Sequence, residues 1–262
     1  MHPILFDFFG INIYSYGFFI AVGAIAGVAY MAVRGKKDVG LTFDQANSLF
    51  LVIFLAALVG GKVFLFFEDV SFYTQHPDRL VAGRGFVFYG SFLFAIPAMM
   101  IFFKKNKLPT YAMLDVMAVT TCLVHMFGRI GCFMAGCCYG KKTDFFLAVT
   151  YTDQACQANP LNTPLHPTQL YEAAYILGVM VFLLYLRDRK KFYGQLFLVY
   201  LILYAVGRFC FEYLRGDQER GLLLNSLISH SQLVATLISA VVAFTYIRWS
   251  SQNQVSNFKK PI

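Results

Sequence analysis

The sequence predicts an all-α polytopic membrane protein with seven transmembrane helices. Of its 262 residues, 58% are hydrophobic and only 14% are charged, and the mean hydropathy is +0.58. Soluble domains contain about 45–50% apolar and about 25% charged residues, so a water-soluble core of this size cannot bury so much apolar surface. The composition therefore excludes a soluble enzyme, a disordered chain and a disulfide-framed secreted module.

The basic charge balance does not indicate a nucleic-acid binder. The formal net charge is +8, but excess Lys and Arg in a membrane protein belong on the cytoplasmic loops. We therefore expect membrane lipids, and no nucleic acid, among its partners.

Seven stretches approach the roughly 20 apolar residues that a transmembrane helix needs. We expect them to form one integral membrane domain over residues 1–262, with a small outer head over approximately 134–168. Pro97 should kink the short third span, which membrane helices tolerate. The predicted spans are approximately 14–33, 44–67, 86–103, 112–133, 169–186, 193–213 and 229–248.

Loop charges predict an outside N-terminus and a cytoplasmic C-terminus, because cytoplasmic loops are enriched in Lys and Arg. The loops after spans one, three and five and the C-terminal tail hold thirteen of the 22 basic residues: Arg34, Lys36, Lys37, Lys104, Lys105, Lys107, Arg187, Arg189, Lys190, Lys191, Arg248, Lys259 and Lys260. The opposite loops hold six: Arg79, Arg84, Lys141, Lys142, Arg215 and Arg220.

Three basic residues remain within or at the edge of the spans, namely Lys62, Arg129 and Arg208. A charge at the bilayer centre costs about 3 kcal/mol or more, so such residues usually face a polar cavity. Two structural alternatives stay open. Arg208 could pair with Glu212 one turn later, and Lys62 could extend to the outer interface.

The richest polar stretch runs from Gly128 to Gly140 and contains four glycines and Arg129. Glycines let the backbone turn sharply and approach a ligand closely, and the planar fork of an arginine suits a phosphate. A helix-packing motif of small residues with an interfacial arginine is an equally good interpretation.

Two further polar stretches lie on the predicted outer side. Residues 166–172 open span five, where Thr168 is expected to cap the helix. In span six, Arg208, Glu212 and Arg215 recur at i, i+4 and i+7, which predicts one charged helical face. Two or three arginines could hold a phosphodiester and stabilise charge developing on a leaving phosphate.

At these residues the sequence resembles the prolipoprotein diacylglyceryl transferase family, in seven segments that follow in the same order. Gly60-Gly-Lys62 stands where the family has Gly-Gly-Arg, and Gly128-Arg-Ile-Gly131 is the core of the family signature. The other matching segments are Tyr14-Ser-Tyr-Gly17, Gly85-Phe-Val-Phe-Tyr-Gly90, His166-Pro-Thr-Gln-Leu-Tyr-Glu172, Gly207 to Arg215, and Ser231-Gln232.

The resemblance implies a transferase of the bacterial cytoplasmic (inner) membrane that needs no cofactor. The family moves the diacylglyceryl group of phosphatidylglycerol to the lipobox cysteine thiol of a preprolipoprotein, and glycerol 1-phosphate leaves. Carried over by position, the catalytic residues are Arg129, Arg208, Tyr89 and Glu212. The substrate-binding residues are Tyr16, Lys62, Gly128, Gly131, Cys132, Cys137, His166, Gln169, Tyr171, Glu172 and Arg215.

Besides Lys62, the chain departs from the family at three positions. Tyr89 replaces the histidine usually proposed as the base, Cys132 replaces an asparagine, and Cys137 replaces a glutamate. A tyrosine with a pKa of about 10 is a poor base at neutral pH, although it could donate a hydrogen bond or act as tyrosinate beside an arginine. The incoming thiol has a pKa of about 8.5, so some group must take or attract its proton.

Cysteines gather on the predicted outer side, where an oxidising environment favours disulfides. We predict a bridge between Cys156 and either Cys137 or Cys138, and we expect no metal. Three alternatives stay open: a metal site in which Cys132, Cys137 and Cys138 are joined by His125 or His166, cysteines that merely fill small buried positions, and one cysteine acting as nucleophile or transient lipid acceptor.

Competing functions also stay open. A related enzyme could transfer a glycerophospholipid-derived group to another acceptor through a cysteine-based site. An anion or metal transporter or binding protein could use the same arginines and cysteines, and seven spans with an outside N-terminus also describe receptors. The enzymes would remove the head group of phosphatidylglycerol, whereas a transporter would leave the lipid intact.

Overall fold

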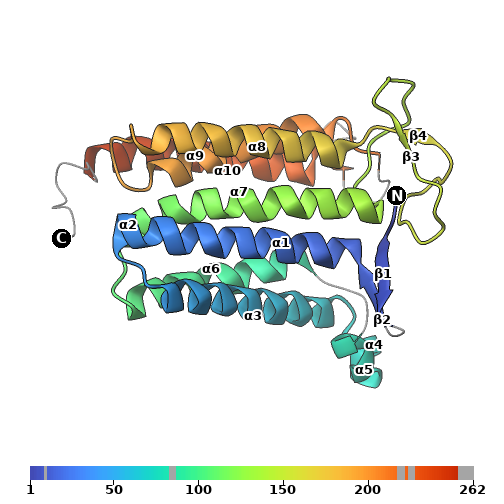
Figure 1. Ribbon diagram of the computed structural model, residues 1–262, viewed down its shortest axis with the longest axis horizontal. Coiled ribbons are helices and arrows are strands. Elements are labelled where there is room, and N and C mark those ends of the chain that lie inside the picture. Colours follow the sequence, from blue (N-terminus) through green and yellow to red (C-terminus); the bar gives the residue numbers. More distant parts are fainter. Residues whose placement is uncertain (9–10, 83–86, 217–221, 224–227, 253–262) are drawn as a thin grey trace. The chain divides into compact units, whose positions relative to one another are not determined.

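The chain forms long helices in a computed structural model that describes residues 1–8, 11–82, 87–216, 222–223 and 228–252 (Figure 1). All seven ranges predicted as spans contain a helix. Several residues used in the prediction of orientation or family, including Arg84, Gly85, Arg220, Lys259 and Lys260, lie outside the described residues.

The helices follow one another with short connections as far as α7, whereas residues 136–167 separate α7 from α8. In chain order they are α1 (Ser15–Tyr30), the π-helical η1 (Met31–Gly35), α2 (Lys36–Val39), α3 (Phe43–Glu68), α4 (Val70–Gln75), α5 (Pro77–Ala82), α6 (Phe88–Lys105), α7 (Thr110–Ala135), α8 (Thr168–Arg187), α9 (Gln195–Glu212) and α10 (His230–Gln252).

Among the described residues, five helical segments are long and apolar enough to cross a membrane. They are Ser15–Val39, Phe43–Glu68, Thr110–Ala135, Thr168–Arg187 and Gln195–Glu212. The apolar part of α10 is shorter, at Ala235–Ser250, and the Pro97-containing α6 is not among the five. The helical membrane fold is therefore confirmed, whereas the count of seven spans and the orientation stay predictions.

Among the residues that the structure describes, three short antiparallel strand pairs accompany the helices, and the sequence analysis did not predict them. They are β1 (Ile4–Phe8) with β2 (Ile11–Tyr14), β3 (Val149–Thr150) with β4 (Pro164–Leu165), and β5 (Leu222–Leu223) with β6 (Ile228–Ser229). Strands of two residues are too short to show the period-two alternation that identifies a strand in a sequence.

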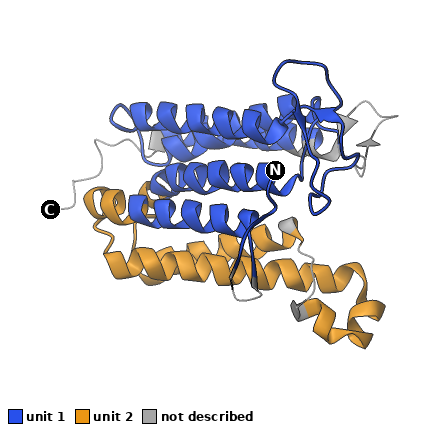
Figure 2. Ribbon diagram, turned by 45° about the vertical axis from the view of Figure 1, so that its right-hand side comes forward, with its two compact units in different colours: residues 1–30, 114–260, 262 blue, residues 31–113, 261 orange. Residues whose placement is uncertain are grey.

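The chain divides into two compact units (Figure 2). Unit 1 comprises Met1–Tyr30 and Leu114–Lys260, with α1, most of α7, and α8 to α10. Unit 2 comprises Met31–Met113, with η1 to α6. The predicted single domain over residues 1–262 stays a prediction, and each unit is described by itself.

In unit 2, α3 and α6 touch through their backbones at two glycines. A Cβ added at Gly60 would lie 2.3 Å from the carbonyl oxygen of Gly90, and one added at Gly90 would lie 2.4 Å from that of Gly60. Small residues allow this close approach of membrane helices. Because Lys62 and Tyr89 stand within two residues of the contact, they lie at the same end of unit 2.

In unit 1, α7, α8 and α9 run side by side and share a buried core (Figure 1). Its fully packed members are Ala118, Val119, Cys122, Ile176, Val179, Leu183, Leu196 and Tyr200. The helix α10 packs on α9 through Val242, which contacts Leu198 and Phe192. This core leaves one end of the three helices, marked by Arg129, Glu172 and Arg208, for polar groups.

At the other end of this core, Asp115 of α7 fixes the start of α9. The Asp115 side chain is 3% exposed, and its Oδ2 lies 2.8 Å from Nζ of Lys190. Its Oδ1 accepts hydrogen bonds from the backbone N–H groups of Leu196, at 2.9 Å, and Phe197, at 3.3 Å. The N-cap residue Gly194 offers no side chain to these groups, so a carboxylate from another helix takes over the capping role.

Candidate active site

Arg129 of α7 and Glu172 of α8 form a buried ion pair across two helices. Nη2 of Arg129 lies 2.7 Å from Oε2 of Glu172, and the two side chains are 14% and 6% exposed. The Nε of Arg129 also donates to Nε2 of His125, one turn earlier, at 3.2 Å. The guanidinium is therefore held from two sides, in a bundle of largely apolar helices.

A second ion pair lies on α9. Nη2 of Arg208 is 2.9 Å from Oε2 of Glu212, and both side chains are largely buried. The pairing that the sequence left open for Arg208 is confirmed. It matches the i, i+4 spacing of the two residues on one helical turn.

Both ion pairs contribute to the lining of one narrow pocket between α7, α8 and α9. Its walls are His125, Glu172, Tyr175, Ile176, Tyr204, Gly207, Arg208 and Phe211. Within the described part of the chain, Oε1 of Glu172 is buried and accepts no hydrogen bond. A buried acceptor left in this state costs about 1–3 kcal/mol, so this oxygen marks a place for a hydroxyl of a ligand or a water molecule.

The glycines flanking Arg129 serve helix packing, as the alternative interpretation of this stretch proposed. A Cβ added at Gly131 would lie 3.2 Å from Cδ2 of Tyr16 on α1, and one added at Gly128 would lie 3.3 Å from Cδ1 of Ile20. Gly131 and Gly128 thus let α7 lie close to α1, while the Arg129 side chain between them reaches Glu172 on α8.

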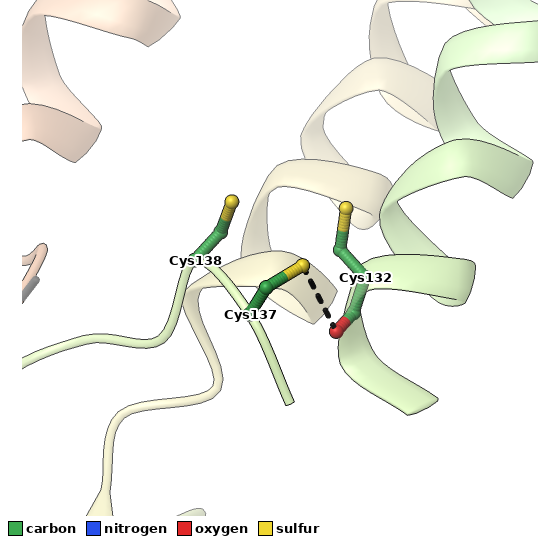
Figure 3. A group of neighbouring side chains, drawn as sticks. All are labelled: Cys132, Cys137 and Cys138. Atoms are coloured by element: carbon green, nitrogen blue, oxygen red, sulfur yellow. Dashed lines mark hydrogen bonds between the residues drawn. The ribbon is translucent and has the colours of Figure 1, made fainter. Parts of the chain in front are cut away.

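Beyond α7 the chain turns back sharply and gathers three cysteines. Gly136 and Cys138 have positive φ angles of 77° and 60°, and the N–H groups of Gly136 and Cys137 both donate to the carbonyl of Cys132. A left-handed residue is a common helix terminator. The turn places the sulfur atoms of Cys132, Cys137 and Cys138 within 4.8 Å of one another (Figure 3).

The start of α8 holds this cysteine loop by two side chains. Oγ1 of Thr168 donates to the carbonyl of Cys138 at 2.7 Å, and Nε2 of Gln169 donates to that of Cys137 at 2.6 Å. The prediction that Thr168 caps α8 is wrong, because Pro167 is the N-cap residue and no side chain caps the helix. The Thr168 hydroxyl instead serves the neighbouring loop.

Two more predicted site residues border the same loop. The N–H of Gly140 donates to the carbonyl of His166 at 2.8 Å, and Nδ1 of His166 lies 3.3 Å from the hydroxyl of Tyr171. Arg215 was predicted to share a helical face with Arg208 and Glu212. That prediction is wrong, because α9 ends at Glu212 and Arg215 instead forms an isolated antiparallel bridge with Gly140.

The predicted disulfide of Cys156 is also wrong, since all six cysteines are free thiols. Cys156 packs in a separate cluster with Tyr139 and Tyr151, whereas Cys137 and Cys138 turn toward Cys132 (Figure 3). Hydrogen bonds from the Cys132 and Cys137 thiols hold the pKa of Cys138 well below its usual range, and the charges of Arg215 and Arg129 act in the same direction. Hydrogen bonding with Cys132 and Cys138 raises the pKa of Cys137.

Lys62 and Tyr89 belong to unit 2, where Tyr89 stands in the first turn of α6 and is 64% exposed. The structure brings together the predicted residues of unit 1, and the roles of these two residues stay predictions.

Three pocket residues with polar side chains were missed or used differently by the sequence analysis. Tyr175 and Tyr204 were not singled out, and His125 was considered only as a metal ligand. Each lies three or four residues from a predicted site residue on the same helix, at the spacing that brings side chains together. This spacing was the signal available in the sequence.

Sequence similarity now identifies the family. Residues 3–248 match the family described as prolipoprotein diacylglyceryl transferase. The chain belongs to this family. A relative from Clostridium tetani (strain Massachusetts / E88), named phosphatidylglycerol–prolipoprotein diacylglyceryl transferase, is 35% identical over 255 residues, which cover 96% of this chain and 100% of the relative.

Other members of the diacylglyceryl transferase family are similar over nearly the same length. A protein of Clostridium perfringens (strain 13 / Type A), named phosphatidylglycerol–prolipoprotein diacylglyceryl transferase 2, is 31% identical and covers 91% of both chains. A Clostridioides difficile (strain 630) protein with the name phosphatidylglycerol–prolipoprotein diacylglyceryl transferase is 27% identical and covers 98% of this chain and 99% of its own. The resemblance seen in the sequence motifs is thereby confirmed.

Proposed function

We propose that this protein transfers the diacylglyceryl group of phosphatidylglycerol to the lipobox cysteine thiol of a prolipoprotein. Relatives that are named for that activity match this chain over nearly their full length. The structural observation that supports it is that two buried arginine–carboxylate ion pairs lie at one pocket among apolar helices. Charged groups inside a membrane bundle are expected to serve a polar substrate.

The reaction needs positive charge at the leaving group. The thiol sulfur forms a bond with the glycerol carbon that carries the phosphate, and the carbon–oxygen bond breaks. The oxygen keeps the electron pair, glycerol phosphate leaves and the thiol proton is released. Guanidinium groups aimed at this phosphate stabilise the charge that develops on it, and a single such donor typically contributes about 10²- to 10³-fold in rate.

Each polar group of the pocket then has a role. Arg208 and Arg129 hold the phosphate, for which the guanidinium fork is suited. Glu172 orients Arg129 through Oε2. Its other oxygen, Oε1, accepts a hydrogen bond from a hydroxyl of the glycerol head group. Glu212 orients Arg208 in the same way. In the absence of lipid, the two carboxylates neutralise the two arginines.

The membrane topology completes the proposal. Seven spans with an outside N-terminus place the pocket, the cysteine loop and Arg215 in the outer half of the bacterial cytoplasmic membrane, where a translocated prolipoprotein presents its thiol. Tyr16, His166, Gln169 and Tyr171 belong to the substrate site of unit 1, as the family motifs indicate. The same motifs make Lys62 a substrate-binding residue of unit 2.

Purified protein given labelled phosphatidylglycerol and a lipobox peptide tests the proposal. We expect lipid on the cysteine peptide, none on a matched Cys→Ser peptide, and one glycerol phosphate released per transfer. The absence of transfer from protein shown to be folded overturns the proposal. Movement of an anion or metal across vesicles, with phosphatidylglycerol intact, would favour the transporter instead.

The substitution Tyr89→Phe tests whether the tyrosine hydroxyl takes part in transfer. A neutral hydrogen bond contributes about 0.5–1.5 kcal/mol, so its loss should slow transfer up to about tenfold at neutral pH. The rate is measured across a pH series, since a hydroxyl that handles a proton also shapes the alkaline limb. Tyr185→Phe, at an exposed tyrosine on α8, is the control. Unchanged rate and pH profile would remove Tyr89 from the mechanism.

A further inference from the structure

Three thiols in unit 1 lie close enough to share one metal ion. The sulfur atoms of Cys132, Cys137 and Cys138 are within 4.8 Å of one another, and all three residues are partly buried. A zinc–sulfur bond is about 2.3 Å long, so two sulfurs on one tetrahedral zinc ion lie about 3.8 Å apart. Small side-chain rotations would close the group around an ion.

The backbone around these thiols is fixed by partners on another helix. Thr168 and Gln169, both fully buried, donate to the carbonyls of Cys138 and Cys137. Cys138 itself keeps a left-handed φ of 60°, which is unfavourable for a residue with a side chain and persists where surrounding contacts impose it. In metalloproteins, buried hydrogen bonds typically hold the metal-ligating residues in place.

The number of ligands indicates the kind of site. Across the described part of the chain, the group that could hold a metal contains these three residues alone, and neither His125 nor His166 joins it. Structural zinc sites have four protein ligands, whereas catalytic sites have three and keep the fourth position open. Three thiolates with Zn²⁺ carry one net negative charge, and the positive charges of Arg215 and Arg129 act on the Cys138 sulfur.

We propose that Cys132, Cys137 and Cys138 bind one Zn²⁺ ion, and that its fourth position takes the incoming thiol of the acceptor peptide. This role rests on the proposed transfer function. The peptide sulfur displaces a water molecule from zinc and loses its proton to solvent, because coordination to zinc deprotonates a thiol. The zinc-bound thiolate then attacks the glycerol carbon, the carbon–oxygen bond electrons go to the phosphate, and water replaces the product thioether on the metal.

Metal content tests the site without any activity measurement. Full-length protein is purified in detergent with a reductant, and its metals are quantified by mass spectrometry. We expect about one zinc per chain, and loss of most of it in Cys132→Ser, Cys137→Ser and Cys138→Ser. Cys210→Ser, at an exposed cysteine of α9, is the matched control and should keep its zinc. Folded wild-type protein without zinc, or with copper in its place, overturns the proposal, as does zinc retained by all three variants.

Cobalt substitution tests the open position. Co²⁺ in the site should give sulfur-to-metal charge-transfer bands and intense visible bands of tetrahedral cobalt. A lipobox peptide added without lipid should change them, and its Cys→Ser version should not. Identical spectra with both peptides overturn the thiol-binding role.

Transfer assays separate this inference from the proposed function. Transfer at the wild-type rate by zinc-free protein or by the triple serine variant overturns the role of the metal and leaves the transferase function intact. Stoichiometric zinc with a thiol-dependent cobalt spectrum, but without transfer to the peptide, supports the metal site and overturns the transferase function.

Discussion

The substitution Arg129→Lys is expected to slow diacylglyceryl transfer by about 10²- to 10³-fold, although it keeps the positive charge. The Arg129 guanidinium contacts Glu172 at 2.7 Å and His125 at 3.2 Å from two different nitrogens. A lysine ammonium is a point charge and cannot reproduce this fork or bind a phosphate through two parallel hydrogen bonds. Initial transfer rates at saturating phosphatidylglycerol measure the effect. Arg187→Lys, at the opposite end of α8, is the control and should transfer at the wild-type rate.

A double variant separates the catalytic role of Arg129 from its structural role. Removing one partner of a buried ion pair destabilises a protein by about 3–5 kcal/mol, because the other charge stays behind. Arg129→Gln should therefore lower the melting temperature, and Arg129→Gln with Glu172→Gln should recover most of it. Transfer should stay low in both. Recovery of transfer along with stability would show that Arg129 acts only as a structural partner.

The helices could be predicted from the length of the apolar stretches. Part of the site could be predicted because burying a charge in the bilayer costs free energy. Arg129 and Arg208 stand out in the sequence because a bilayer excludes unpaired charge. Their partners differ in how visible they are. Glu212 lies one turn from Arg208, and the sequence offered that pairing as an alternative. The pairing of Arg129 with Glu172 depends on which faces of α7 and α8 meet. A single sequence does not contain that information.

The errors have local physical causes. The prediction continued the helix of span six to Arg215, whereas α9 ends at Glu212. No glycine lies at that end to indicate it in the sequence. Thr168 has the right residue type and position for a cap, but a buried carbonyl of the cysteine loop competes for its hydroxyl. The predicted disulfide followed from the oxidising compartment and from the rarity of bridges between adjacent cysteines. The left-handed turn at Gly136 and Cys138, which decides where those thiols point, was not considered.

The buried charge of Asp115 was overlooked because the search of the spans started from their basic residues and from the family motifs. Asp115 lies near the start of the fourth predicted span, and Lys190 lies in a loop that was counted only for orientation. The same argument that singles out Arg129 applies to a carboxylate in an apolar helix. The structure shows that this carboxylate pairs with Lys190 and caps the start of α9.

The substitution Asp115→Ala should lower the free energy of unfolding by about 3–5 kcal/mol, the usual effect of breaking a buried ion pair. It removes the partner of the Lys190 ammonium and leaves the N–H groups of Leu196 and Phe197 without their acceptor. Asp115→Asn keeps a carbonyl oxygen for those groups and should lose less. Asp188→Ala removes an exposed carboxylate that pairs with Arg187, and it should change stability by less than about 1 kcal/mol.

Thermal unfolding in detergent, followed by circular dichroism, ranks these variants. Asp115 lies fourteen residues before Arg129, about 21 Å along α7, so it is too distant to touch the substrate. The transfer rate per folded molecule should therefore stay near the wild-type value in Asp115→Asn, even as its melting temperature falls. A melting temperature of Asp115→Ala equal to that of Asp188→Ala would contradict the capping role. A specific loss of transfer in stable Asp115→Asn would instead link this end of α7 to the chemistry.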